Sequence, residues 1–209
     1  MLKVGLTGGI ASGKTTVAQM LAQQGCHLLY ADRIAHTLMA PGGPAYGEIV
    51  QAFGREVLDS SGALHRGRLG EIIFADAARR EQLNRIVHPR VIAETEKEFA
   101  RLATADPKGV AVVEAALLVE AGYHRRLDKL LVTWCPREQQ LERLMETAGL
   151  SRPQAEQRLA AQLPPEEKRR LADYLIDCSG SLAATEQQVE TVCGELRRLA
   201  EGGSNARDS

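Results

Sequence analysis

A short segment close to the start of the chain, Gly8–Thr16, reads GGIASGKTT and matches the pattern G-x-x-x-x-G-K-[ST]. It follows the apolar run Lys3–Leu6 and leads into an amphipathic stretch, Lys14–Gln24. Between a strand and a helix, this pattern forms a loop whose backbone N–H groups converge on phosphate oxygens, aided by the positive end of the helix. The sequence therefore predicts an α/β fold that begins with a strand and carries a nucleoside-triphosphate site.

The loop residues have distinct expected roles. Lys14 is expected to bridge β- and γ-phosphate oxygens, and the hydroxyl of Thr15 is expected to ligate Mg²⁺. The residues expected to surround the phosphates are Gly8, Gly9, Ile10, Ala11, Ser12, Gly13, Lys14, Thr15 and Thr16.

Short apolar runs alternate with longer amphipathic stretches along the chain. The runs are rich in leucine and β-branched residues and are apolar on both faces, as a buried parallel sheet requires. We therefore expect a P-loop NTPase-type, three-layer α/β fold with a parallel five-stranded sheet. The expected strands are Lys3–Leu6, His27–Tyr30, Val110–Glu114, Lys129–Trp134 and Tyr174–Asp177.

Two helical segments interrupt this alternation. Residues 31–103 are too long for one crossover and predict a helical substrate-binding insertion at the carboxyl edge of the sheet. Residues 137–170 are rich in Arg and Lys, which suits a lid that closes over phosphates but equally suits a solvated helical face. The nucleotide-binding core then comprises residues 1–30, 104–136 and 171–200, and we expect residues 201–209 to form a flexible tail.

Bulk properties narrow the range of partners. The formal net charge of −1 and the small number of aromatic residues give no basis for binding nucleic acid. The sequence shows neither a signal peptide nor an apolar window long enough to span a membrane, and its four cysteines form no C-x-x-C pair. We therefore expect a soluble cytoplasmic protein that acts on small molecules, either as a monomer or as a small homo-oligomer.

Asp32 stands where the apolar run ending at Tyr30 gives way to a helix. One interpretation is that its carboxylate caps the helix by accepting bonds from the first free amides. The other is that it faces a reacting hydroxyl, which it orients for in-line attack. The two roles are compatible, because one oxygen can cap the helix while the other points into a cleft.

A second carboxylate, Glu114, ends the strand GVAVVE and is expected beside the loop, where it would hold Mg²⁺ through water. An ordinary surface acid at a strand end explains it equally well. The segment Asp59–Gly62 reads DSSG and matches the GTPase pattern D-x-x-G, but no strand precedes it and the chain contains no N-K-x-D. We interpret that match as a coincidence in a turn.

Several stretches taken together resemble the dephospho-coenzyme A kinase family. These are LTGGIASGKTTVA, ADRIAHTL, APGGPAYGEIVQAFG, DSSGALHRGRLGEIIFAD, LNRIVHPRV, VVEAALLVEAG and ADYLIDCSG, and they occur in the order of the family from about residue 3 to residue 200. The loop alone is shared by many families, whereas the ordered set is much more specific.

The resemblance implies a P-loop core, a helical coenzyme A domain and a lid. The implied reaction is ATP- and Mg²⁺-dependent phosphorylation of the ribose 3′-hydroxyl of dephospho-coenzyme A. It implies that Asp32 contacts that hydroxyl, that Lys14 stabilises the transferring phosphoryl group, and that Arg143 neutralises phosphate charge. His36, one helical turn beyond Asp32, is a candidate substrate contact, although a lone helical histidine is more often structural.

Departures from the family pattern bear on the loop and the lid. Ala11 stands where glycine is usual, which we expect to be tolerated if its φ stays negative. Thr147 and Ala148 stand where the family often has Arg-Asp, which leaves Arg137 and Arg158 as possible substitutes.

Two other functions remain open. One is a different small-molecule or nucleoside monophosphate kinase with the same core. The other is a nucleotide-dependent binding module without turnover.

Overall fold

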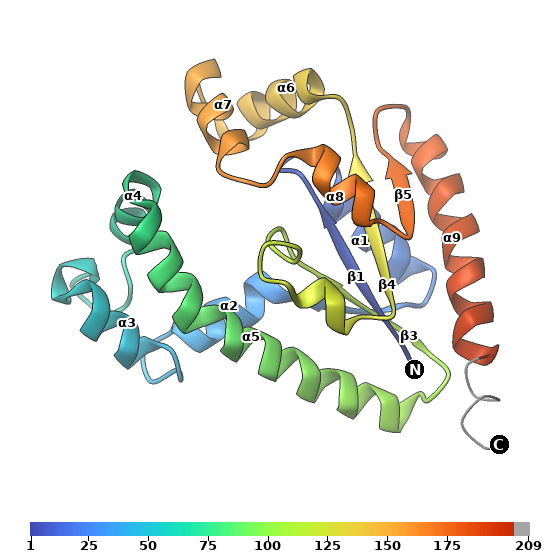
Figure 1. The fold of residues 1–209 in the computed structure, drawn as a ribbon, viewed down its shortest axis with the longest axis horizontal. Helices are drawn as coiled ribbons and strands as arrows, with labels where there is room; N and C mark the ends of the chain where they lie inside the picture. Colours follow the sequence, from blue (N-terminus) through green and yellow to red (C-terminus); the bar gives the residue numbers. More distant parts are fainter. Residues whose placement is uncertain (203–209) are drawn as a thin grey trace. The chain divides into compact units, whose positions relative to one another are not determined.

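The computed structural model describes residues 1–202 and contains a five-stranded sheet with the order β2-β3-β1-β4-β5 (Figure 1). Parallel pairing joins β1 to β3 and to β4, and β4 to β5. The strands are β1 (Leu2–Gly8), β2 (His27–Tyr30), β3 (Val110–Glu114), β4 (Lys129–Trp134) and β5 (Tyr174–Asp177). The expected strands and the parallel α/β sheet are confirmed.

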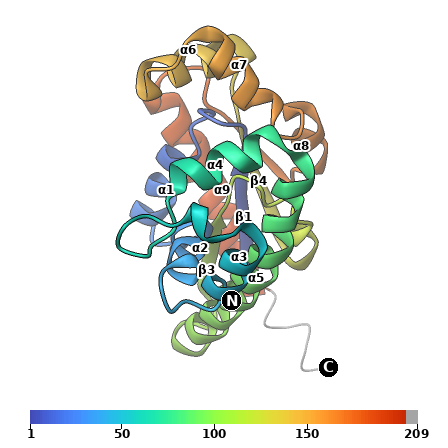
Figure 2. The same cartoon turned by 90° about the vertical axis from the view of Figure 1, so that its left-hand side faces the viewer.

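Helices cover both faces of this sheet. Helices α1 (Lys14–Gln23) and α9 (Leu182–Gly202) pack on each other and on β1 and β3, whereas α8 (Pro165–Leu171) packs on β1 and β4. Figure 2 shows α1 and α8 on opposite sides of β1. This double cover explains why residues 4–8 of β1 are all buried. The expected three-layer arrangement is confirmed.

A separate helical unit spans Tyr30–Glu98 and has its own hydrophobic core. The first unit comprises Met1–Leu29 and the described chain from Phe99 onward. The helical unit contains α2 (Ala31–Met39), α3 (Tyr46–Phe53), the 3₁₀ turn η1 (Arg55–Val57), α4 (Arg66–Ala75) and most of α5 (Ala77–Ala105). Its buried core residues are Leu38, Ala45, Ile49, Phe53, Val57, Leu69, Leu83, Ile86 and Val87. This unit corresponds to the expected insertion, residues 31–103, whose role in binding substrate stays a prediction.

The DSSG segment of this unit is a local turn. The Oδ1 atom of Asp59 accepts bonds from the backbone N of Ser61 at 2.8 Å, from its hydroxyl at 2.6 Å, and from the backbone N of Ala63 at 3.1 Å. The bonds from Ser61 hold the pKa of Asp59 below its usual range, because they favour the charged carboxylate. The carboxylate therefore forms hydrogen bonds within its own turn. This agrees with the interpretation that the match of DSSG to the GTPase pattern is a coincidence.

The helices of segment 137–170 pack in two different ways. Helices α6 (Arg137–Ala148) and α7 (Arg152–Ala160) pack on each other around Leu141, Leu144 and Ala155, whereas α8 lies on the sheet. A second 3₁₀ turn, η2 (Tyr123–Arg126), follows β3.

Helix α9 continues to Gly202, and the rest of the expected tail, residues 203–209, lies outside the described residues. Within residues 1–202, no helix is both long enough and apolar enough to cross a membrane. All four cysteines are buried and none forms a disulfide, which agrees with their interpretation as small core residues.

Candidate functional site

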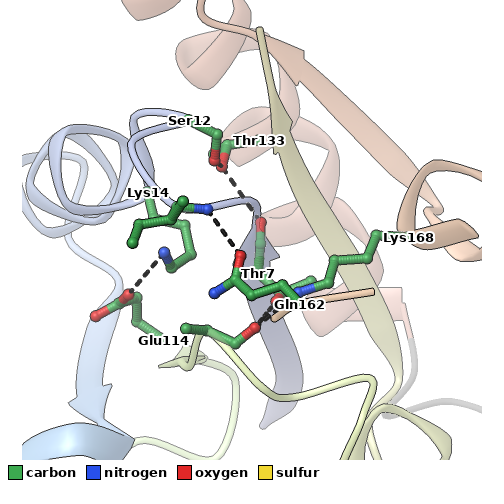
Figure 3. Close-up of polar contacts among 9 residues, drawn as sticks. Thr7, Ser12, Lys14, Glu114, Thr133, Gln162 and Lys168 are labelled. Carbon is green, nitrogen blue, oxygen red and sulfur yellow. Dashed lines mark hydrogen bonds and ion pairs between the residues drawn. The ribbon is translucent and has the colours of Figure 1, made fainter. Parts of the chain in front are cut away.

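The segment Gly8–Thr16 forms a loop that leaves β1 and enters α1. Gly13 occupies the N-cap position of α1 in a left-handed conformation (φ 95°), which glycine adopts without strain. The Ser12 hydroxyl lies 2.7 Å from the Thr133 hydroxyl on β4 (Figure 3). A Cβ atom at Gly8 would lie 2.1 Å from the Thr133 hydroxyl oxygen. The loop thus requires glycine at Gly8, because β4 lies directly against it.

Ala11 differs from the expectation based on the sequence. Its φ is +57°, in the left-handed region, so the condition under which alanine was expected to be tolerated, a negative φ, is not met. In this region the Cβ of an L-residue crowds its own backbone, at a cost of roughly 1–2 kcal/mol. Alanine at this position is therefore strained.

We expect Ala11→Gly to raise the free energy of unfolding by about 0.5–1 kcal/mol, since glycine relieves the strain but adds entropy to the unfolded chain. Urea denaturation measures the change. The matched control is Ala100→Gly at an exposed position inside α5, where the same substitution should lower stability by about 1 kcal/mol. A loss of stability in both variants would show that Ala11 is not strained.

Lys14 and Glu114 come together beside the loop. Strand β3 pairs with β1 so that Glu114 lies level with Leu6, just before the loop begins. The Nζ atom of Lys14 is 4.0 Å from the Oε1 atom of Glu114, and the two side chains are 12% and 11% exposed (Figure 3). The structure therefore places Glu114 beside the loop, with an ion pair that balances its charge.

A cavity of about 520 Å³ opens beside the loop. The guanidinium of Arg143 reaches it from α6 and donates to the backbone oxygen of Cys178 at 2.7 Å. Among the described residues, neither Arg137 nor Arg158 lines the cavity, whereas Thr147 does. The full lining is Ala11, Gly13, Lys14, Thr15, Thr16, Arg143, Thr147, Cys178, Gly180, Leu182 and Thr185.

Polar contacts also join the loop to the segment between α7 and α8. The backbone N of Ile10 donates to the Oε1 atom of Gln162 at 2.9 Å (Figure 3). Lys168 on α8 has a fully buried side chain, and its Nζ atom lies 2.9 Å from the Oε1 atom of Glu120 and 2.8 Å from the backbone oxygen of Ala116. A buried lysine needs such partners, because an unpaired charge in the interior is strongly unfavourable.

We expect Lys168→Met to lower the free energy of unfolding by about 3–5 kcal/mol, because it leaves Glu120 as an uncompensated charge that is only 19% exposed. Urea denaturation monitored by circular dichroism gives this value. Lys97→Met is the control, since Lys97 is 72% exposed and its ion pair with Glu94 should contribute at most about 1 kcal/mol. The double variant Lys168→Met/Glu120→Gln should regain part of the lost stability. Equally small losses in Lys168→Met and in the control Lys97→Met would contradict the argument.

In the helical unit, Asp32 and His36 lie on α2. Both are exposed, and their spacing of four residues places them on one face of the helix. The interpretation of Asp32 as the helix cap is wrong, because α2 begins at Ala31 and its N-cap is Tyr30. Strand β2 runs into the helix without a connecting residue, so the last strand residue takes the cap position and Asp32 falls in the first turn.

Several residues at this site carried no signal in the sequence. Thr133 lies within a buried strand, and Gln162 lies in a polar segment. Cys178 directly follows β5, and Thr185 lies in the first turn of α9. Nothing in their local pattern distinguishes them from structural residues, because only the folding of the sheet brings them to the loop.

The chain is similar to known proteins over nearly its whole length. The family model described as dephospho-CoA kinase matches residues 2–184. A Bacillus licheniformis protein named dephospho-CoA kinase is 46% identical over 188 residues, which is 90% of this chain and 93% of that protein.

Two solved structures are also similar. A Thermus thermophilus crystal structure has a TM-score of 0.79 at 34% identity and covers 93% of this chain and 97% of its own. The structure titled dephospho-CoA kinase from Campylobacter jejuni has a TM-score of 0.69 at 28% identity, with coverage of 94% and 97%.

Proposed function

Because the chain belongs to the dephospho-CoA kinase family, we propose that it phosphorylates the ribose 3′-hydroxyl of dephospho-CoA with ATP. The 3′-oxygen bonds to the γ-phosphorus, the bond from that phosphorus to the β–γ bridging oxygen breaks, and ADP leaves. The hydroxyl proton passes to Asp32 or to water. The observation that carries the proposal is the loop Gly8–Thr16, with Lys14 and Arg143 lining one cavity beside it.

The loop is assigned to the triphosphate of ATP. Its N–H groups and the start of α1 favour negative charge, and Lys14 supplies a point charge at the β- and γ-phosphates. Glu114 lies 4.0 Å from this lysine and balances its charge. Arg143 lines the same cavity from α6, and we assign to it the neutralisation of phosphate charge.

Mg²⁺ fits the oxygen donors at this site. Thr15, which carries a hydroxyl, is exposed and lines the cavity, and Glu114 lies near Lys14. A hydroxyl and a carboxylate are the hard oxygen donors that Mg²⁺ takes, with water and phosphate oxygens completing its coordination. Bound there, Mg²⁺ would neutralise charge on the phosphates. Thr15 would ligate it directly, and Glu114 through water.

Asp32 is assigned to the acceptor hydroxyl. Its exposed position in the first turn of α2 leaves the carboxylate accessible to a substrate. A carboxylate is a weak base near neutral pH, so its larger contribution is to orient the hydroxyl for in-line attack. His36 lies one turn further along the same face, and we assign it to substrate contact.

We assign binding of the acceptor substrate to the helical unit. We assign the role of a lid over the phosphates to segment 137–170. The partners that the reaction requires are small molecules, ATP and dephospho-CoA. We further propose that the enzyme acts in the cytoplasm, as a monomer or small homo-oligomer, without binding nucleic acid.

A coupled assay for ADP release tests the reaction. Mg·ATP is offered with dephospho-CoA, adenosine, AMP, CMP or no acceptor, and we expect turnover with dephospho-CoA alone. Preference for AMP or CMP would replace the substrate assignment with that of a nucleoside monophosphate kinase. If no acceptor stimulates ADP release although ATP binds stoichiometrically, the protein is a nucleotide-dependent binding module.

A further inference from the structure

One side chain joins the phosphate loop to the segment between α7 and α8. The backbone N–H of Ile10 donates to the Oε1 atom of Gln162 at 2.9 Å. Figure 3 shows Gln162 directed toward the loop from the side of Lys168. Ile10 precedes Ala11, the strained residue of the loop, so this bond acts where the backbone must be held in an unfavourable conformation.

The segment that carries Gln162 is itself anchored at the next residue. The backbone N of Leu163 donates to the Oε1 atom of Glu120 at 3.3 Å, and the same oxygen accepts from Lys168 at 2.9 Å. The segment is thus held by an ion pair whose lysine is fully buried. A partner held this way loses little freedom when it makes a further bond.

The ion pair of Lys168 and Glu120 is also linked to β1, the strand that leads into the loop. The backbone oxygen of Ala116 accepts from Lys168 at 2.8 Å and from the Thr7 hydroxyl at 3.3 Å. Thr7 and Ile10 lie on either side of the two glycines that begin the loop. The first turn of the loop is therefore fixed at both ends by contacts that converge on Lys168 and Glu120.

We propose that Gln162 is a positioning residue for ATP, which fixes the first turn of the phosphate loop to the anchored segment between α7 and α8. A P-loop binds phosphate through backbone N–H groups that must point to a common centre. Conformational freedom of the backbone at Ile10 and Ala11 would turn these groups away from that centre. The bond also links the loop to the segment that follows α6 and α7, the helix pair that carries Arg143. The inference rests on the proposed function only in taking the bound nucleotide to be ATP.

The test is calorimetric titration of Mg·ATP into the protein without any acceptor. Gln162→Met keeps the length of the side chain but removes the acceptor, and we expect it to raise the Kd for ATP about fivefold, the effect of losing one hydrogen bond. Amide hydrogen exchange of the peptide containing Ile10 should accelerate in the free protein. Gln187→Met is the control at an exposed position on α9 and should change neither quantity.

A second variant distinguishes the effect of side-chain length at Gln162 from the effect of its polar amide. Gln162→Asn keeps the amide but is one methylene shorter, so it should behave like Gln162→Met. In turnover assays, both variants should raise KM for ATP and leave KM for dephospho-CoA unchanged. Unchanged ATP affinity in folded Gln162→Met, or wild-type behaviour of Gln162→Asn, would overturn the proposal. Because the titration needs no acceptor, its result is independent of whether dephospho-CoA is the substrate.

Discussion

Replacing Asp32 with Asn is expected to lower kcat by about 10²- to 10⁴-fold, the range for loss of a positioned acid or base. The amide is the same size as the carboxylate but cannot take a proton and is a poorer acceptor for the substrate hydroxyl. The fold should remain intact, because Asp32 is exposed and is not the cap of α2. Its interaction with the positive end of the helix should contribute at most about 1 kcal/mol.

The measurement is steady-state ADP release with Mg·ATP and dephospho-CoA, together with thermal unfolding of both proteins. Glu81→Gln is the control, since it removes an exposed carboxylate from α5 in the same helical unit and should leave kcat unchanged. If Asp32→Asn turns over at nearly the wild-type rate, Asp32 does not contact the reacting hydroxyl. A large loss of thermal stability would instead assign it a structural role.

Lys14→Met is expected to lower kcat by about 10³-fold, because it removes a preorganised positive charge from the transferring phosphoryl group. Binding of ATP should suffer less, since the backbone N–H groups of the loop remain. The substitution also leaves Glu114, whose side chain is 11% exposed, without the charge of its neighbouring lysine, so a loss of stability should accompany the loss of rate.

The double variant Lys14→Met/Glu114→Gln separates these two effects. It should regain stability relative to Lys14→Met but not kcat, because no cation is restored at the phosphates. Lys108→Ala, at an exposed position before β3, is the control for removal of a lysine and should change neither quantity. Recovery of kcat in the double variant would mean that the unbalanced carboxylate, rather than the missing cation, slows the reaction.

Much of the fold was predictable from the sequence because its three central strands, β1, β3 and β4, are largely buried. In β3, residues 110–113 are all apolar, which excludes an amphipathic surface strand and requires helices on either side. Apolar patterning does not by itself fix the residue at which a helix begins. Helix α2 begins at Ala31 and α3 at Tyr46, because a strand end and a preceding turn residue take the cap positions.

The sequence by itself determined the phosphate loop, since spacing along the chain defines that motif. Gly8, Gly13, Lys14 and Thr15 are close in the chain, so the strand and helix that flank them suffice to bring their groups together. The ordered segments likewise indicated the family, which the comparisons confirm. The roles of Asp32, Arg143 and His36 stay predictions.

Only the tertiary structure decided what surrounds the loop. The contact of Thr133 with Ser12 and the bond from Ile10 to Gln162 join segments distant in the chain, and the positive φ of Ala11 is seen only in the folded loop. The pairing of β4 with β1 brings Thr133 to the loop, and the buried pair of Lys168 and Glu120 fixes the segment beside Gln162. Local sequence patterns record which face of an element is buried, but the partners found there are set by strand order and by helix packing across the sheet.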